Sequence, residues 1–173
     1  MTQADKLLIV TGKNDVHSDF MIDLLTRQGY GDRVIRLNTE DLLTNVVLTQ
    51  TVAHGQSTLS VDLRDSGKSF TPSDVGCVWY RKPEDVVIPD QFEDDAKDFV
   101  LGTAESVLQG LYYLFSDTAV WINPRQTARI SSNKMRQLKL ASDMGFKVPR
   151  TIVTNRPDRI LAFSDEVGIV CTK

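Results

Sequence analysis

WINPRQTARISSNKMRQLKLASDMGFKVPRTIVTN, residues 121–155, decides how the second half of this chain folds. The apolar start of the stretch meets an Asn-Pro pair, a turn signal that closes a strand. Ser131 or Ser132 can then cap a helix whose apolar residues recur about one turn apart. Gly145 supplies a left-handed helix end, and the β-branched run at 151–154 predicts another strand. The stretch therefore predicts strand, helix and strand.

Lys134 falls in the first turn of this predicted helix. A lysine is unfavourable there, because the N-terminus of a helix already carries a partial positive charge. A binding site for an anion would account for two positive features in one place. A solvated surface lysine is the alternative, and the pattern alone leaves both interpretations open.

The first third of the chain predicts a βαβ unit. Residues 6–11 (KLLIVT) form a continuous apolar run, typical of a strand buried on both faces of a parallel sheet. An amphipathic helix is expected at 18–28, with Phe20, Leu24 and Leu25 on its inner face. Residues 32–37 predict the second strand, so strand, helix and strand form a right-handed crossover.

The next segment predicts a β-hairpin at 45–53 and 57–62, antiparallel and at a sheet edge, with a short returning strand at 68–70. A buried strand at 74–80 follows and delivers Arg81 and Lys82 at its C-terminal end. Because ligands bind at that edge of open α/β sheets, these two residues are candidates to hold an anionic group or a partner's carboxylate. A basic rim without a ligand is the alternative.

The longest predicted helix is 92–115, with apolar residues repeating at intervals of three and four. So broad a stripe can exceed what one sheet face covers, which suggests a homodimer surface. After residue 155 the pattern predicts a helix at 158–167 and a closing strand at 168–173.

The composition excludes several classes of protein. A net charge of −3 gives no electrostatic case for binding nucleic acid or an anionic membrane. No apolar run approaches the roughly 20 residues of a membrane span, and the polar start is not a signal peptide, so a cytoplasmic location is expected. Cys77 and Cys171 are expected to be buried thiols, and His17 and His54 have no partner at metal-ligand spacing, so no metal site is expected. The first loop matches neither GxGxxG nor a P-loop.

Asn133-Lys134 at a helix start, followed by GFKVPRT at 145–151, resembles the entry to the nucleotide-binding part of ATP-grasp ligases. Three N-terminal stretches are similar to the first domain of the microviridin-type branch of that family: KLLIVTGKNDVHSDFMIDLL (6–25), RVIRLNTEDL (33–42) and VWYRKPEDV (78–86). The branch modifies ribosomally made peptides and resembles the glutamate ligases that modify a ribosomal protein. The four stretches stand in family order and cover almost the whole chain.

The resemblance implies an α/β fold: a Rossmann-like, mostly parallel sheet with helices on both faces and an antiparallel hairpin edge. Residues 1–125 would form this pre-ATP-grasp domain, and residues 126–173 would begin the ATP-grasp region. In such ligases ATP and magnesium activate a carboxylate as an acyl phosphate, which an amine or hydroxyl then attacks. Lys134 and Lys173 match the family's two phosphate-binding lysines. A precursor peptide or protein would be the partner.

The family's adenine-binding strands, magnesium ligands and acyl-phosphate arginine would all lie beyond Lys173. The chain, whether a cloned fragment or a naturally truncated protein, is therefore expected to contain no catalytic residue and to be inactive alone. It is also expected to bind ATP no more tightly than millimolar. The alternative is a stand-alone α/β binding or sensor module that uses Arg81 and Lys82.

Overall fold

The computed structural model describes residues 4–116 and 119–171. The chain divides into two compact units, Met1–Arg125 and Gln126–Lys173, and each is described by itself.

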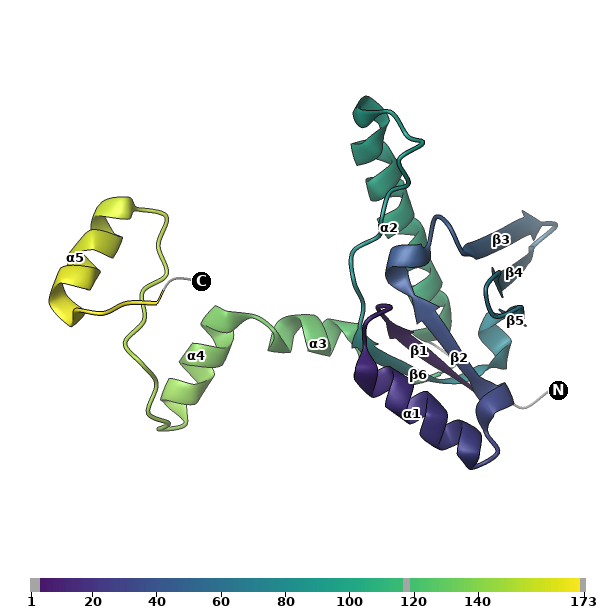
Figure 1. Cartoon of the computed structure of the whole chain (residues 1–173), viewed down its shortest axis with the longest axis horizontal. Coiled ribbons are helices and arrows are strands. Elements are labelled where there is room, and N and C mark those ends of the chain that lie inside the picture. The colour runs from purple at the N-terminus through teal and green to yellow at the C-terminus, as the bar shows by residue number, and fades with distance from the viewer. Residues whose placement is uncertain (1–3, 117–118, 172–173) are drawn as a thin grey trace. The chain divides into compact units, whose positions relative to one another are not determined.

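The centre of the first unit is a four-stranded parallel sheet in the order β2-β1-β6-β7 (Figure 1). Its strands are β1 (Lys6–Thr11), β2 (Val34–Asn38), β6 (Val75–Lys82) and β7 (Val120–Ile122). β2 lies on one side of β1 and β6 on the other, so the order in which the chain adds strands reverses at β1. Doubly wound folds have the same arrangement and bind ligands at such a point. The predicted α/β fold with a mostly parallel sheet is therefore confirmed.

Two helices cover opposite faces of this sheet, α1 (Val16–Arg27) and α2 (Asp94–Ser116) (Figure 1). The main core lies on the α2 side, where apolar side chains of the helix pack on β1, β2 and β6. Its largest fully buried members include Phe70, Phe115, Leu8, Ile35, Leu37 and Leu111.

The predicted hairpin is antiparallel and consists of β3 (Val46–Ala53) and β4 (Gln56–Leu63). With β5 (Lys68–Phe70) it makes a separate three-stranded sheet and does not extend the parallel one. Val61 and Phe70 point into the main core, so this second sheet closes the α2 side.

The predicted inner face of α1 is partly wrong. Phe20 is 68% exposed and Leu24 is 38% exposed, whereas Ser18 is fully buried and Leu25 is half-buried. The helix begins at Val16 and not at residue 18. Its buried or half-buried residues are 18, 21, 22 and 25, whose spacing of three and four places them on one side. Phe20 and Leu24 lie on a different side of the helix.

The second unit contains α4 (Lys134–Asp143) and α5 (Pro157–Val167), and α3 (Arg125–Ser131) leads into it. Both predicted helices are confirmed, but α3 was not expected. The strands predicted at 151–154 and 168–173 are wrong as far as the structure describes them, because 151–154 and 168–171 are extended or bent without ladder partners. A strand needs a neighbour, and in this unit the described residues offer none.

The two cysteines also differ from expectation. Cys77 is half-buried in β6, and burial raises the pKa of its thiol. Cys171 is exposed, because the strand that was expected to bury it is not formed. Within the described residues, no helix is long and apolar enough to span a membrane.

Candidate functional site

The first candidate site is the N-terminus of α4, where Lys134 is the first helical residue. The predicted cap was wrong: Ser131 ends α3, and the Asn133 side chain caps α4 by accepting a hydrogen bond from the Arg136 backbone N–H at 3.0 Å. Lys134 Nζ donates to Gln137 Oε1 at 2.9 Å. Over residues 4–116 and 119–171 no carboxylate pairs with this ammonium group, so its charge is available to an anion.

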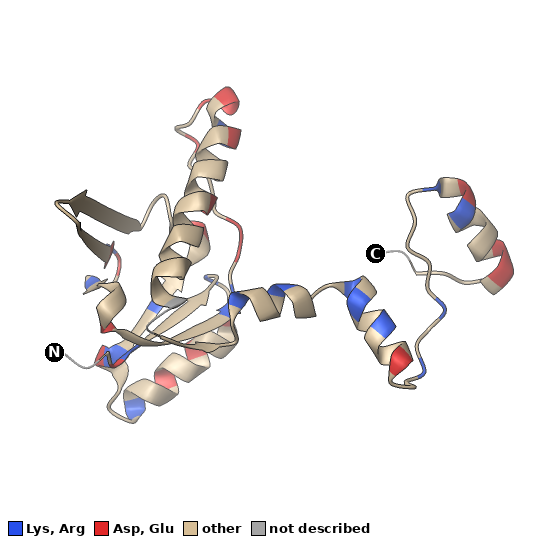
Figure 2. Ribbon diagram, turned by 180° about the vertical axis from the view of Figure 1, so that it is seen from behind, with Lys and Arg blue, Asp and Glu red and all other residues tan. Residues whose placement is uncertain are grey.

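The unit that contains Lys134 is basic, although the chain as a whole is acidic. Residues 126–173 contain nine Lys or Arg and four Asp or Glu, whereas the whole chain has a net charge of −3. Lys and Arg residues lie along α4 and in the segments that flank it (Figure 2). This unit therefore attracts anions more strongly than the overall charge suggests.

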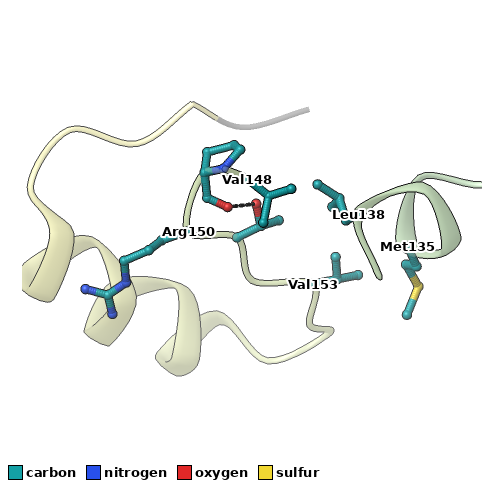
Figure 3. A pocket seen from close by; sticks show the side chains of 7 residues that line it. Met135, Leu138, Val148, Arg150 and Val153 are labelled. Atoms are coloured by element: carbon teal, nitrogen blue, oxygen red, sulfur yellow. Dashed lines mark hydrogen bonds between the residues drawn. The ribbon is translucent and has the colours of Figure 1, made fainter. Parts of the chain in front are cut away.

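An open recess of about 470 Å³ lies beside α4 (Figure 3). Met135 and Leu138 of the helix face an extended segment that follows it, and the guanidinium of Arg150 points away toward α5. Arg150 is engaged there, since its Nη2 lies 2.5 Å from Glu166 Oε1. The recess is lined by Met135, Leu138, Val148, Pro149, Arg150, Thr151 and Val153. It is a mainly apolar surface next to a basic helix start.

This second unit has no core of its own in the part of the chain that the structure describes. None of the residues 126–171 is buried. Large apolar side chains are exposed on α4, on α5 and between them: Met135, Leu140, Met144, Phe146, Val153 and Leu161 are each more than half exposed. Burial of these apolar side chains against another surface would stabilise the folded unit.

The second candidate site is the C-terminal edge of the parallel sheet, centred on Asp15. This carboxylate is 4% exposed and accepts hydrogen bonds from Thr11 Oγ1 at 2.8 Å, Ser18 Oγ at 2.6 Å and the His17 backbone N–H at 3.2 Å. Burial works to raise the pKa of Asp15, but these donors and the charge of Arg81 outweigh it and lower the pKa to about 2. Asp15 is therefore an anion at neutral pH.

The segment after β6 crosses this edge and contacts the residues that follow β1 and β2. Thr39 Oγ1 donates to the Glu84 carbonyl at 2.5 Å and accepts from the Glu84 N–H at 2.8 Å. A Cβ at Gly12 would lie 2.4 Å from Glu84 Cγ, so the glycine lets the Glu84 side chain approach, and not a phosphate. The segment after β6 is therefore held against the loop after β1 at this edge of the sheet.

Arg81 and Lys82 lie at the end of β6 as predicted, and each faces an acidic group. Arg81 Nε is 3.8 Å from Asp15 Oδ2, and Lys82 Nζ is 3.1 Å from Glu84 Oε1. Asp15 and Glu84 were not among the predicted site residues. The position of Asp15 before an amphipathic helix is an N-cap signal that could have identified it, whereas nothing in the sequence indicates the path of Glu84.

Lys173 lies outside the described residues. Among the described residues there is no group of three or more His, Cys, Asp or Glu that could hold a metal ion, so no residue here is assigned to magnesium.

The comparisons with known proteins agree with this architecture. The family model of the MvdD pre-ATP grasp domain matches residues 6–129. The chain belongs to this family. The expected resemblance to the microviridin-type branch of the ATP-grasp ligases is thereby confirmed. No curated protein sequence matches the chain.

Solved structures of two macrocyclases and of an ATP-grasp ligase share the fold. The macrocyclase MdnB from Microcystis aeruginosa MRC is 22% identical with a TM-score of 0.82, over 94% of this chain and 52% of that one. The macrocyclase MdnC from the same organism, bound with precursor peptide MdnA, is 22% identical with a TM-score of 0.76, over 93% and 50%.

A RiPP-associated ATP-grasp ligase from Chryseobacterium gregarium, in complex with ADP and a leader and core peptide, is 26% identical with a TM-score of 0.72. The match covers 94% of this chain and 48% of that ligase. The chain thus spans about half the length of the ligases that share its fold.

Proposed function

We propose that this chain is the N-terminal part of an ATP-dependent ligase that joins a carboxylate to an amine or a hydroxyl on a ribosomally made peptide. The reaction would pass through an acyl phosphate, with ATP and magnesium bound in the complete enzyme. Family membership supports the class of enzyme, and the precursor peptides and ADP bound by its structural relatives support the substrates. A cytoplasmic location is proposed with it, because ATP is available there.

The observation that carries the proposal is Lys134 at the first position of a capped helix in a basic unit. Backbone N–H groups and the helix dipole favour an anion at this end, and the unpaired ammonium group adds a full charge. We assign Lys134 to an ATP phosphate, and Lys173 to the second phosphate contact.

The lack of any buried residue among 126–171 supports the view that this chain alone is inactive. Exposed apolar side chains such as Met135 and Val153 would be stabilised by packing against another apolar surface. In a site open to water, the electrostatic attraction between a lysine and a phosphate is weak. Two lysine–phosphate contacts in an open site contribute about 2 kcal/mol, from about 1 kcal/mol for each pair in water. Even millimolar binding requires about 4 kcal/mol.

We further propose that the first unit forms a homodimer through α2. Its outer side exposes Phe99 (76%), Val107 (40%) and Leu114 (41%). Beside them an apolar groove of about 280 Å³ runs between α2 and the β3–β4 hairpin. Light scattering at high protein concentration tests this proposal: a dimer that Phe99→Glu dissociates is expected, and a monomer of the unsubstituted chain contradicts it.

The ligase proposal is tested in the complete enzyme by following ADP release that depends on precursor peptide. Lys134→Ala removes a charge-assisted phosphate contact of about 1.5–3 kcal/mol, so kcat/KM should fall about 10- to 100-fold. Lys139→Ala is the matched control, because Lys139 lies on the same helix but pairs with Asp143 at 2.6 Å. Equal activity of the two variants would contradict the assignment of Lys134 to the nucleotide site.

A further inference from the structure

We propose that Asp15 is a positioning residue, which orients Arg81 so that its two terminal nitrogens face outward to bind a single carboxylate of the peptide substrate. The inference rests on the proposed function and adds to it a binding site at the edge of the parallel sheet.

The fixed part of this site is the Asp15 carboxylate. Three neutral donors, from Thr11, Ser18 and the His17 backbone, hold both of its oxygens at 2.6–3.2 Å, and the side chain is 4% exposed. A buried carboxylate with so many donors cannot turn to follow a partner. It therefore presents a stationary negative charge to Arg81, whose Nε lies 3.8 Å from Oδ2.

The free part of the site is the Arg81 fork. Its side chain is 34% exposed, and among the described residues only Asp15, on the Nε side, faces the guanidinium. The N–H groups of Nη1 and Nη2 therefore remain available to donate hydrogen bonds to a ligand. Two parallel N–H donors match the two oxygens of a carboxylate.

Arg36, at the same edge of the sheet, shows the opposite arrangement. Its Nε donates to Asn38 Oδ1, its Nη1 to Asp19, and its Nη2 to the carbonyls of Gly12 and Lys13. Every nitrogen of Arg36 thus donates a hydrogen bond, to β2, to α1 or to the loop after β1. No described residue accepts from the two terminal nitrogens of Arg81.

The charges around Arg81 favour a carboxylate over a phosphate. Asp15 and Glu84 together balance Arg81 and Lys82, and Lys82 is already paired with Glu84 at 3.1 Å. A carboxylate adds one negative charge to this balanced group, whereas a phosphate adds up to two. The His17 ring, with Nδ1 3.6 Å from Asp15 Oδ1, is the one other basic group that faces Asp15 among the described residues.

The side-chain Nε–Hε signal of Arg81 in the ¹⁵N-labelled chain tests the inference. The probes are glutamate and glutamine, each blocked at both ends as an N-acetyl N-methylamide, and inorganic phosphate. Blocked glutamate should shift the Arg81 signal saturably in the millimolar range, and blocked glutamine should not. Arg33 is the internal control, because it pairs with Asp5 at 3.4 Å just before β2, at the other end of the sheet.

Asp15→Asn separates positioning from folding, since asparagine also caps helices well. The variant also removes a negative charge beside Arg81, which by itself would strengthen the binding of an anion. If orientation is what Asp15 provides, the variant should nevertheless bind blocked glutamate at least fivefold more weakly while its circular dichroism stays that of the unsubstituted chain. Equal affinity in the variant, equal binding of blocked glutamine, or tighter binding of phosphate would each overturn the inference. The Lys134 assay in the complete enzyme does not depend on this site, so failure here leaves the proposed ligase activity standing.

Discussion

Asp15→Asn should remove the part of the first unit's acid sensitivity that comes from the Asp15 carboxylate. In the folded protein the pKa of Asp15 falls from its usual 3.8 to about 2. A difference of that size corresponds to about 2 kcal/mol of folding free energy. Because the folded pKa is the lower one, this stabilisation is complete above about pH 4 and is lost as the pH falls through about 2. The substitution removes the group that titrates, so the variant lacks this loss.

Urea unfolding followed by tryptophan fluorescence measures the effect, because Trp79 and Trp121 both lie in the first unit. At pH 7 the variant should be about 1–2 kcal/mol less stable than the original chain, and the two stabilities should converge near pH 2. Asp74, whose pKa is also lowered by hydrogen bonds from Thr71, contributes equally to both proteins. Parallel stability curves between pH 5 and pH 2 would refute the role given to Asp15.

Four further substitutions test the packing of the first unit by the same unfolding assay. Gly76→Ala places a Cβ 2.3 Å from the Ala4 carbonyl oxygen and should cost about 1–3 kcal/mol, whereas Gly102→Ala, with nothing within 4 Å, should stabilise α2 by up to about 1 kcal/mol. A neutral Gly76→Ala would mean that the N-terminal segment does not pack there. Tyr112→Phe removes a buried hydroxyl without a partner among the described residues, so stability should stay equal or rise, and a loss above about 1 kcal/mol would reveal a partner. Phe115→Ala, which empties the place of a fully buried ring stacked on Phe70, should cost about 3–5 kcal/mol, and a smaller loss would show that the core closes over the cavity.

Local sequence patterns predict the central strands of the parallel sheet well because all residues of β1 and β2 are buried or half-buried. Lys6–Thr11 is a strand with the predicted bounds, and Val120–Ile122 is one as well. Continuous apolar runs of this length have few alternatives when turn residues flank them. The placement of Arg81 and Lys82 follows from the same signal, since the end of a strand fixes which residues reach the edge.

The failures have a common cause, which is that burial depends on neighbours in space. The buried side of α1 includes the polar Ser18, whereas the apolar Phe20, which the pattern assigns to the inner face, is 68% exposed. The runs at 151–154 and 168–171 have strand composition, but composition does not supply a pairing partner. The pairing of Asp15 with Arg81 could not be predicted, because the two residues meet only through the position of β6 in the folded sheet.

The central claim is that this chain contributes a share of an ATP site that is incomplete without further polypeptide. A calorimetric titration of the chain with magnesium and ATP tests it most directly. The account predicts no binding tighter than about millimolar, because two lysines in an open site fall short of the roughly 4 kcal/mol required. Micromolar binding of ATP by these 173 residues alone would contradict it.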